Sequence, residues 1–432
     1  MPRTINLNHI TKIEGHARLH VVIDNGQVKK AKLKIFEGSR FFEGLLKGKK
    51  FDELPTISSR ICGVCSVVHT IAAVKAIETA FNVKVSKQTD LLRELLNIGG
   101  TVQSHALHLF FLVLPDYFGF SSAIEMASEH KNLIRYALAL KKAGNRIVQI
   151  VAGRDIHPIS CVVGGFSRIP DKKRLKELIK ELDSVKSLAK KSIKVFAELD
   201  YPHFDLITPH FALRGKSYFY SDDIIKCTFE GCVNIQDYES HFHEHFRRGS
   251  TAEFATKEGK SYMVGALPRV LISKDQLHTP AKYIKQLEKN RNSPYMNVLA
   301  QSIEIYEGII RSIEILEKLI PRLKSESPVK FTPVEGEGIA AIEAPRGILF
   351  HRYKFNKEGI CTYANLTTPT TQNLANMEDS IKFLVHELIN TCDPKKQRCD
   401  SEIKLEIEKL IRAYDPCISC STHFLELKWE EK

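Results

Sequence analysis

The feature that most constrains this chain is a pair of Cys-x-x-Cys motifs near its two ends. The first motif holds Cys62 and Cys65, and the second holds Cys417 and Cys420, in a sequence of 432 residues. Four thiolates from two such turns form a soft cage that suits zinc, an iron–sulfur cluster or a soft transition metal. A cage built from both pairs requires a fold that joins segments about 350 positions apart in the sequence.

Three interpretations of the two pairs are open: a structural zinc site, a redox dithiol and a reactive metal site. The pairs of a structural zinc site usually lie within about 15–20 residues of each other, far closer than these two. A thioredoxin-type dithiol would explain one pair and leave the other without a role. Polar groups beside both pairs can hydrogen-bond sulfur and hold thiolates deprotonated, which favours a reactive metal site. These groups are Arg60, His69, Asp415 and His423.

The composition argues against several other classes of protein. The chain has a formal net charge of +12, but its basic runs lack the interleaved aromatic residues that stack on bases, so we do not expect nucleic-acid binding. The most apolar segment, 109–114, is followed by Pro115 and is much shorter than the ~20 residues of a membrane span. Ten cysteines without a secretory signal pattern indicate reduced thiols or metal ligands and predict a cytoplasmic protein.

The hydrophobic pattern predicts a mostly helical fold with two small sheets. Segments 17–23 and 31–35 alternate in polarity around an Asn-Gly pair, which is typical of tight hairpin turns, and predict an N-terminal antiparallel sheet. Segments 338–344 and 348–366 predict a second sheet in the C-terminal third. Helical periodicity covers the stretches 67–81, 88–114, 123–151, 172–198, 281–323, 379–391 and 401–412. We therefore predict one α+β unit, predominantly helical, with a core of long bundled helices.

Both cysteine motifs resemble those of a known family. Residues 60–69 read Arg-x-Cys-Gly-x-Cys-x-x-x-His and residues 415–423 read Asp-Pro-Cys-x-x-Cys-x-x-His, which look like the two signature motifs of the large subunit of nickel–iron hydrogenases. Five further segments resemble family segments in the same order: 12–16, 41–44, 104–108, 343–347 and 366–370. The resemblance covers the whole chain and implies a single large-subunit domain over residues 1–423.

The compact length, segment 112–117 and the ending 415–423 look most like the cytoplasmic, multisubunit branch of this family, whose members couple hydrogen to NAD(P), sulfur or a deazaflavin coenzyme. The resemblance implies a catalytic subunit that reversibly cleaves dihydrogen heterolytically and passes electrons to an iron–sulfur small subunit. The chain lacks a Gly-rich dinucleotide motif and the cysteine density of an iron–sulfur relay, so further flavin and iron–sulfur subunits are expected partners. The alternative from another class is a noncatalytic, zinc-structured subunit of a redox complex.

The resemblance also implies the ligands and bases of the metal centre. The four motif cysteines, Cys62, Cys65, Cys417 and Cys420, would bind nickel. Cys65 and Cys420 would also bridge to an iron that carries carbon monoxide and cyanide. Cys417 would be the first base for the proton of dihydrogen, and Glu14 would take the proton from it. Without the family match, a turn or capping carboxylate is the more common role for a residue like Glu14.

Further residues are expected around the iron. Arg346 would hydrogen-bond one cyanide through its fixed fork of donors, and Thr370 would donate to the other. Pro345 and Pro369 would shape an apolar wall, and His69 would hydrogen-bond a bridging sulfur. The local sequence alone favours an exposed turn around Arg346 and a satisfied core histidine at His69.

One position departs from the family pattern. Many members carry an aspartate where this chain has Ser104, in a canopy with Arg346 and Asp415 above the metals. Since serine is shorter and neutral, Arg346 would lose one orienting anion. This change puts a charge role for the position in doubt but leaves the metal ligation intact.

Two further groups of residues are candidates for metal binding. Glu43, His423 and the carbonyl of Leu366 resemble a magnesium site, although magnesium usually takes oxygen ligands and a histidine nitrogen is atypical. The alternating histidines of segment 241–245 resemble a metal site in spacing, but a strand or a helix end explains them better.

The last nine residues, 424–432, are predicted to be a propeptide. The resemblance implies a precursor that a dedicated endopeptidase cuts after His423 once nickel-insertion factors have loaded the site. A tail with Phe424, Leu425 and Trp429 would be hard to bury behind the second cysteine pair, so it would hold the precursor open. We therefore expect the mature chain to end at His423.

Overall fold

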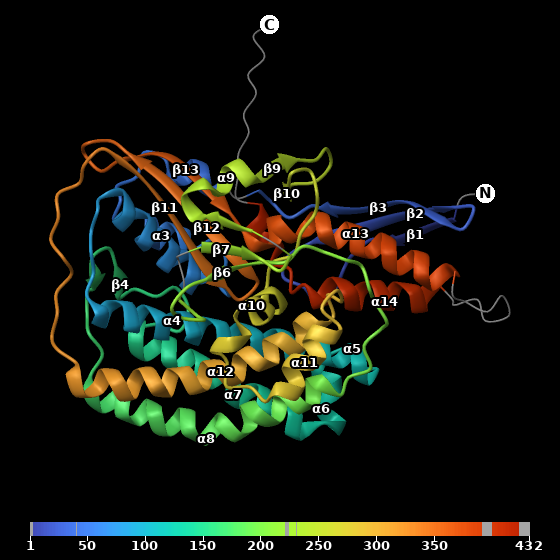
Figure 1. Cartoon of the computed structure of the whole chain (residues 1–432), viewed down its shortest axis with the longest axis horizontal. Coiled ribbons are helices and arrows are strands. Elements are labelled where there is room, and N and C mark those ends of the chain that lie inside the picture. Colours follow the sequence, from blue (N-terminus) through green and yellow to red (C-terminus); the bar gives the residue numbers. More distant parts are fainter. Residues whose placement is uncertain (1–2, 40, 221–223, 230, 391–399, 423–432) are drawn as a thin grey trace, which may run out of the picture.

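The structure of the chain, a computed structural model, describes residues 3–39, 41–220, 224–229, 231–390 and 400–422. Long helices lie side by side on one side of the molecule, and most of the strands lie on the other (Figure 1). The bundle comprises α4 (Lys87–Leu107), α7 (Lys131–Ala152), α8 (Lys172–Ala197) and α12 (Met296–Leu319). Helix α4 packs on α7 and α12, and α8 packs on the same two helices. The predicted helical α+β fold with a long-helix core is therefore confirmed.

Capping side chains fix the starts of two bundle helices. The Ser86 hydroxyl accepts a hydrogen bond from the amide of Thr89 at the start of α4. The Asp171 carboxylate accepts from the amides of Lys173 and Arg174 at the start of α8. These bonds satisfy amide groups that the first turn of a helix leaves without helical partners.

Two of the predicted helices are each divided into two. The predicted helix 281–323 becomes α11 (Ala281–Lys289) and α12, because Pro294 between them disfavours a helical conformation in the residue before it. The predicted helix 123–151 becomes α6 (Ala123–Glu129) and α7. The other α-helices are α1 (Phe42–Leu46), α2 (Leu54–Ser58), α3 (Ser66–Ala80), α5 (Leu114–Phe118), α9 (Tyr238–His241), α10 (Ala266–Ser273), α13 (Pro369–Asn390) and α14 (Asp400–Ala413).

The sequence analysis expects no segment long enough to span a membrane. However, one helical stretch of the bundle, Lys87–Phe118, is long and apolar enough to cross one. The stretch consists of α4, the π-helix His108–Val113 and α5. However, 83% of the window that passes this test is buried inside the fold, where α4 packs on α7 and α12. Within the described residues, the stretch is therefore a core helix of the bundle.

The N-terminal sheet is antiparallel, with strands β1 (Arg3–Leu7), β2 (Ala17–Asp24) and β3 (Gln27–Ile35) in that order. Asn25 and Gly26, which connect β2 to β3, have positive φ angles of 49° and 71°, as a tight Asn-Gly turn requires. Buried side chains alternate along β2, so one face of the sheet packs on the core. The predicted N-terminal sheet is confirmed.

The predicted sheet of the C-terminal third is also present. Its strands β11 (Gly336–Ala344), β12 (Gly347–Phe355) and β13 (Cys361–Thr367) are antiparallel and follow the sequence order. Only Pro345 and Arg346 separate β11 from β12, because Ala344 pairs directly with Gly347. Arg346 therefore lies at the tip of a tight hairpin.

Strand β11 packs directly on helix α3, which follows the first cysteine pair. A Cβ atom added to Gly338 of β11 would lie 1.9 Å from the carbonyl oxygen of Ala76 on α3. The absence of a side chain at Gly338 allows this close approach of strand and helix. The hairpin tip and the first cysteine pair are thereby held in one rigid unit.

The sequence predicts no sheet in the middle of the chain, yet the described residues of this region form three. Their strands have two to five residues, which is too short for a clear period-two pattern. Strand β9 begins where α9 ends, so the histidines of segment 241–245 occupy a helix end and a strand. The pairs and triplets of strands are β4 (Cys161–Val162) with β5 (Gly165–Phe166), β6 (Phe211–Arg214) with β7 (Ile224–Cys227) and β8 (Cys232–Asn234), and β9 (Phe242–Phe246) with β10 (Glu253–Lys257).

Candidate metal centre

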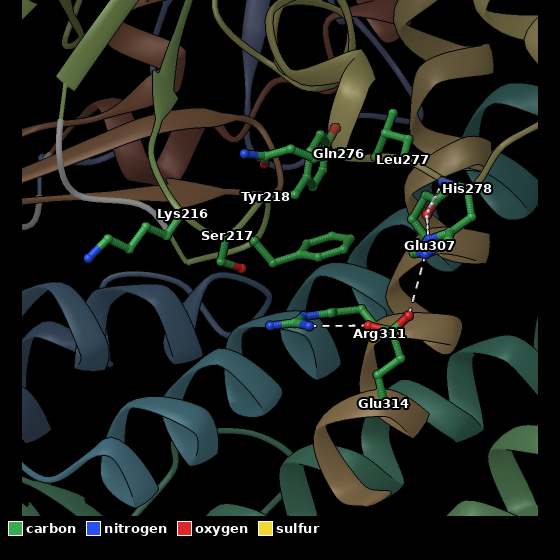
Figure 2. Close-up of a pocket in the computed structure, with 10 residues that line it drawn as sticks. Lys216, Ser217, Tyr218, Gln276, Leu277, His278, Glu307, Arg311 and Glu314 are labelled. Carbon is green, nitrogen blue, oxygen red and sulfur yellow. Dashed lines mark hydrogen bonds and ion pairs between the residues drawn. The ribbon is translucent and has the colours of Figure 1, made fainter. Parts of the chain in front are cut away.

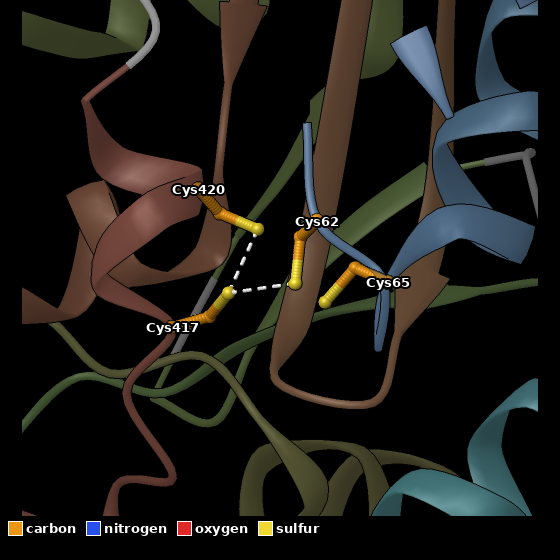
Figure 3. A group of neighbouring side chains, drawn as sticks. All are labelled: Cys62, Cys65, Cys417 and Cys420. Atoms are coloured by element: carbon orange, nitrogen blue, oxygen red, sulfur yellow. Dashed lines mark hydrogen bonds between the residues drawn. The ribbon is translucent and has the colours of Figure 1, made fainter. Parts of the chain in front are cut away.

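The four motif cysteines converge into one cage. Cys62 and Cys65 approach from one side and Cys417 and Cys420 from the other, with their sulfur atoms facing one another (Figure 3). The four ligand atoms lie within 4.8 Å of one another. The sulfur of Cys417 lies 3.4 Å from that of Cys62 and 2.9 Å from that of Cys420. Two segments from opposite ends of the chain thus form a single soft donor set.

Secondary structure fixes where each pair stands. Cys65 directly precedes α3, so it lies at the N-terminal end of that helix. Cys417 directly precedes the 3-10 helix Ile418–Ser421, which carries Cys420. A backbone bridge pairs Glu14 with Cys417, and the amide of Ile418 donates a hydrogen bond to the main-chain carbonyl of Glu14 at 3.0 Å. The N-terminal segment therefore holds the second cysteine pair in place.

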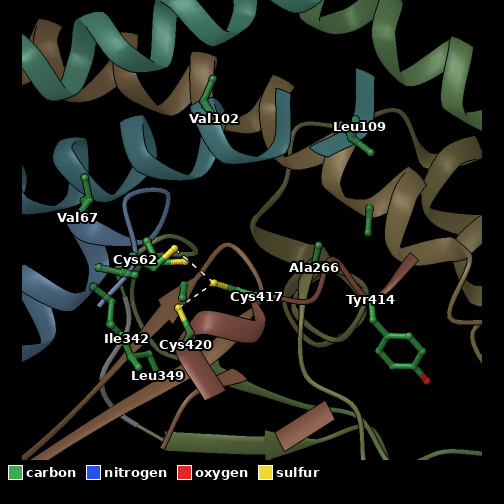
Figure 4. Close-up of a cluster of buried hydrophobic side chains, with 14 of the residues drawn as sticks. Cys62, Val67, Val102, Leu109, Ala266, Ile342, Leu349, Tyr414, Cys417 and Cys420 are labelled. Atoms are coloured by element: carbon green, nitrogen blue, oxygen red, sulfur yellow. Dashed lines mark hydrogen bonds between the residues drawn. The ribbon is translucent and has the colours of Figure 1, made fainter. Parts of the chain in front are cut away.

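The cage is buried among apolar side chains. Each of its cysteines is between 1% and 5% exposed, and Ile342 and Leu349 lie beside it (Figure 4). Burial raises the pKa of Cys417, whereas hydrogen bonds within the cage, first of all from Cys417, lower the pKa of Cys62. A cation bound by these sulfurs would displace the protons of their thiols.

Glu14 lies against the cage through its carboxylate. Its Oε2 atom lies 3.3 Å from the sulfur of Cys417 and accepts a hydrogen bond from the amide of Ser419 at 2.9 Å. The hydroxyl of Ser419 donates to Oε1 at 2.5 Å. Because Glu14 is only half-buried, its carboxylate stands between the buried sulfur and solvent. A carboxylate in this position can accept a proton and pass it on.

The guanidinium of Arg346 covers another edge of the cage. Its Nη1 donates to the sulfur of Cys65 at 3.2 Å. Its Nη2 and Nε donate to the carboxylate and the main-chain carbonyl of Asp415 at 2.9 and 2.7 Å. Burial opposes the charge of Arg346, but Asp415 and the cage thiolates outweigh burial and raise the pKa of Arg346 well above its usual value. A fixed cation therefore faces the sulfur of Cys65.

A second arginine, which the sequence does not single out, holds the tip of the β11–β12 hairpin. Arg269 is buried and donates to the carbonyls of Ala344 and Pro345 at 2.7 and 2.8 Å. Its charge is balanced by Glu304 at 2.6 Å and Glu343 at 2.8 Å. Burial opposes the charge of Glu304, but Arg269 outweighs burial and lowers the pKa of Glu304 to about 2. The hairpin tip is thus fixed by a buried ion-pair network.

Thr370 and Pro369 lie at the start of α13, beside the second cysteine pair. The hydroxyl of Thr370 accepts a hydrogen bond from the amide of Cys417 at 2.9 Å. A hydroxyl can accept and donate at the same time, so the hydrogen of Thr370 remains available for a bond to a bound group. Pro369 is the first residue of this helix.

His69 lies on α3, one turn after the first cysteine pair. Its Nε2 atom lies 3.8 Å from the sulfur of Cys420, and its Nδ1 atom lies 3.1 Å from Nε2 of His351. His351 in turn contacts the hydroxyl of Tyr353 at 2.6 Å. Sequence patterns do not single out His351 or Tyr353, because neither belongs to a short motif. Through His351 and Tyr353, His69 is connected by side-chain contacts to strand β12.

Two of the three predicted magnesium ligands lie together. The carboxylate of Glu43 accepts a hydrogen bond from the amide of Leu366 at 2.8 Å. The third, His423, lies outside the described residues, and so does the predicted propeptide, 424–432.

The histidines of segment 241–245 do not form a metal-binding group with other described side chains. In the part of the chain that the structure describes, the cysteine cage is the group of His, Cys, Asp and Glu residues whose ligand atoms converge closely enough for one ion.

A surface pocket lies between α12 and the connection from β6 to β7 (Figure 2). Four of the side chains that line it form pairs: His278 contacts Glu307 at 3.1 Å, and Arg311 contacts Glu314 at 3.1 Å. None of the predicted site residues lines this pocket.

Comparison with known proteins decides the family of the chain. A family model described as nickel-dependent hydrogenase matches residues 40–136 and 258–423, and a HoxL-like model matches residues 4–37. The sulfhydrogenase 1 subunit alpha of Pyrococcus furiosus is 36% identical over 429 residues, which cover 98% of both chains. The chain belongs to the nickel-dependent hydrogenase family.

Other hydrogenases are similar over the same length. The NAD-reducing hydrogenase HoxS subunit beta of Cupriavidus necator is 28% identical, with 98% of this chain and 96% of that protein covered. A crystal structure of an NAD+-reducing [NiFe]-hydrogenase in the H2-reduced state matches with a TM-score of 0.85 and 25% identity, over 98% of this chain and 99% of that chain. This hydrogenase is therefore an oxidoreductase that acts on hydrogen, and the predicted family, fold and enzyme class are confirmed.

Proposed function

We propose that this hydrogenase holds a nickel–iron centre in its cysteine cage, with carbon monoxide and cyanide on the iron, and reversibly cleaves dihydrogen there. The observation that carries this proposal is the convergence of four buried sulfurs, with a carboxylate and a guanidinium against them. Thiolates are soft ligands that suit nickel. In this proposal Cys62, Cys65, Cys417 and Cys420 would hold the nickel, and Cys65 and Cys420 would also be ligands of the iron.

The chain's own residues would move the proton. When bound, the centre supplies the Lewis acidity that polarises dihydrogen for heterolytic cleavage. Cys417 accepts the proton, and Glu14, 3.3 Å from its sulfur, takes the proton and releases it toward solvent. The amide and the hydroxyl of Ser419 hold the carboxylate of Glu14 in this position.

Other residues of the site would hold the ligands of the iron. Arg346 donates to one cyanide and Thr370 to the other, and His69 donates to the sulfur of Cys420. Pro345 and Pro369 close the apolar wall. These roles are supported by the positions of the side chains, since each of the three donors contacts a cage residue.

We infer the partners from the relatives. Their names describe an alpha subunit of a sulfhydrogenase and a beta subunit of an NAD-reducing hydrogenase. By analogy with these two names, this chain passes electrons to sulfur or NAD(P), through an iron–sulfur small subunit and further flavin and iron–sulfur subunits. A deazaflavin coenzyme, the third acceptor expected from the sequence, has no counterpart in these names. We place this assembly in the cytoplasm.

A magnesium ion is a second proposed cofactor. Glu43, the carbonyl of Leu366 and His423 would bind it, and the contact between the carboxylate of Glu43 and the amide of Leu366 supports this arrangement. Carboxylate and carbonyl oxygens are the ligands that magnesium prefers.

Infrared spectroscopy of the purified complex tests the proposed centre. We expect absorption bands of metal-bound carbon monoxide and cyanide, which lie where protein does not absorb, together with nickel by elemental analysis. Zinc without nickel, and no such bands, would instead support the alternative of a noncatalytic, zinc-structured subunit.

We propose that residues 1–423 form one domain and that 424–432 are removed by a maturation endopeptidase after nickel-insertion factors have loaded the site. Cys417 and Cys420 are buried in the core, which supports removal of the tail once the metal site has closed around them. The intact mass of active, nickel-loaded protein should correspond to a chain that ends at His423, and the metal-free precursor should retain Lys432. Full activity with Lys432 still attached would contradict the proposal.

A further inference from the structure

The carboxylate of Asp415 orients the guanidinium of Arg346. It accepts a hydrogen bond from Nη2, while the main-chain carbonyl of Asp415 accepts from Nε. Asp415 is 2% exposed and has a φ angle of 52°, a left-handed conformation that is uncommon outside glycine. Surrounding contacts must therefore hold Asp415 in place.

Gln301, in the second turn of bundle helix α12, supplies one of these contacts. Its Nε2 atom donates to Oδ2 of Asp415 at 3.1 Å, and its side chain is fully buried. A carboxylate oxygen only accepts hydrogen bonds, so the NH2 group of Gln301 must face Asp415. The Oε1 atom of Gln301 then faces away from Asp415, toward His108.

His108 ties Gln301 to the segment that carries the second cysteine pair. Its Nδ1 atom lies 2.6 Å from Oε1 of Gln301, and its Nε2 atom lies 2.8 Å from the carbonyl oxygen of Arg412. The same Nε2 atom lies 3.8 Å from Oδ1 of Asp415. His108 is the first residue of the π-helix that follows α4, and such helices are frequent at functional sites.

Ser104, one turn before His108, does not help to orient Arg346, so the contacts that hold Asp415 carry more weight in this chain. Its hydroxyl is buried and has no hydrogen-bond partner among the described residues, so it does not orient Arg346. Asp415 is the carboxylate that pairs with Arg346. The placement of Asp415 therefore decides the placement of the guanidinium.

We propose that Gln301 and His108 are positioning residues that hold Asp415, and through it Arg346, over the Cys65 edge of the metal centre. The contacts form a continuous chain from His108 through Gln301, Asp415 and Arg346 to Cys65, at successive distances of 2.6, 3.1, 2.9 and 3.2 Å. The inference rests on the proposed function, in which Arg346 donates to a ligand of the iron.

The variant Gln301→Leu, studied in the nickel-loaded complex, tests this inference. Leucine has a similar volume but cannot donate to Asp415, so we expect displaced cyanide bands in the infrared spectrum. We also expect about tenfold lower kcat at unchanged nickel content, the size of effect that loss of a hydrogen bond to a charged group produces. The matched control is Ser302→Ala, because Ser302 is equally buried on α12 but donates to the carbonyl of Leu299 in its own helix. Its bands should stay where those of the wild type are.

The variant His108→Phe and the double variant test whether the two residues act as one chain. In the proposed chain His108 acts on Asp415 through Gln301, so the double variant should displace the bands no further than Gln301→Leu alone. Displacements that add together would contradict a shared chain. If Gln301→Leu does not fold, Gln301→Asn, which is too short to reach both partners, gives the same readout.

Two outcomes separate this inference from the proposed function. Unmoved cyanide bands in a nickel-loaded Gln301 variant would overturn the inference and leave the proposed function standing. The absence of such bands from the wild-type complex would overturn the proposed function itself.

Discussion

A serine in place of Cys417 is expected to lower hydrogen turnover by about 10⁴-fold or more, because both the metal ligand and the first proton acceptor are lost. An alcohol is a hard and weak ligand for a soft metal such as nickel. It is also a poor substitute for a thiolate base. Hydrogen-dependent dye reduction and elemental analysis of the purified complex measure the two effects, and we expect the nickel content to fall together with the activity.

Cys361 provides the matched control for this variant. Its thiol is also buried, but it lies outside the cage and donates to the carbonyl of Tyr363 at 3.2 Å. A serine hydroxyl can make the same hydrogen bond, so Cys361→Ser should retain both nickel and turnover. Wild-type turnover with intact nickel in Cys417→Ser would refute the assignment of the cage.

Glu14→Gln is expected to keep the metals but to slow hydrogen–deuterium exchange with solvent by about 10²–10⁴-fold, the usual contribution of a proton-transfer group. An amide cannot accept and pass on a proton as a carboxylate does. Its oxygen can still accept from the amide of Ser419, so the fold around the second cysteine pair should persist. The measurement follows the isotopic products formed when deuterium gas is supplied to the enzyme in ordinary water.

Glu53→Gln is a suitable control for the exchange experiment. The carboxylate of Glu53 also accepts a hydrogen bond from a main-chain amide, that of Lys50 at 3.0 Å, but it is exposed and makes no contact with a cage cysteine among the described residues. Its exchange rate should match that of the wild type. If Glu14→Gln exchanges at the wild-type rate, the proton leaves by another path.

The features that sequence predicts well are those that a few neighbouring residues determine. Each Cys-x-x-Cys turn supplies two thiolates from one short segment, so the donor set can be recognised before the fold is known. The turn at Asn25 and Gly26 likewise depends on backbone angles that these two residues tolerate. The two thiolate pairs and the N-terminal hairpin are both of this kind, whereas the meeting of the two pairs in one cage depends on the whole fold.

The other features depend on contacts between distant segments. Gln301 is one of many polar residues on a long helix, and only the packing of α12 beside Asp415 gives it a partner. Arg269 reaches the β11–β12 hairpin from α10 in the same way. The middle sheets escape prediction for a different reason, since strands of two to five residues carry too little periodic signal.

Because the cage combines cysteines from both ends of the chain, it can form only after nearly the whole chain has been translated. The ribosome adds about 5–20 residues per second, so the roughly 350 residues between Cys65 and Cys417 take about 20–70 s to translate. During this interval α3 and the local helical contacts of the bundle can form, since such contacts fold much faster. A truncated polypeptide carries at most half of the thiolates. In the proposed function, a complete set of nickel ligands is therefore available only in a chain that has been translated through the second pair.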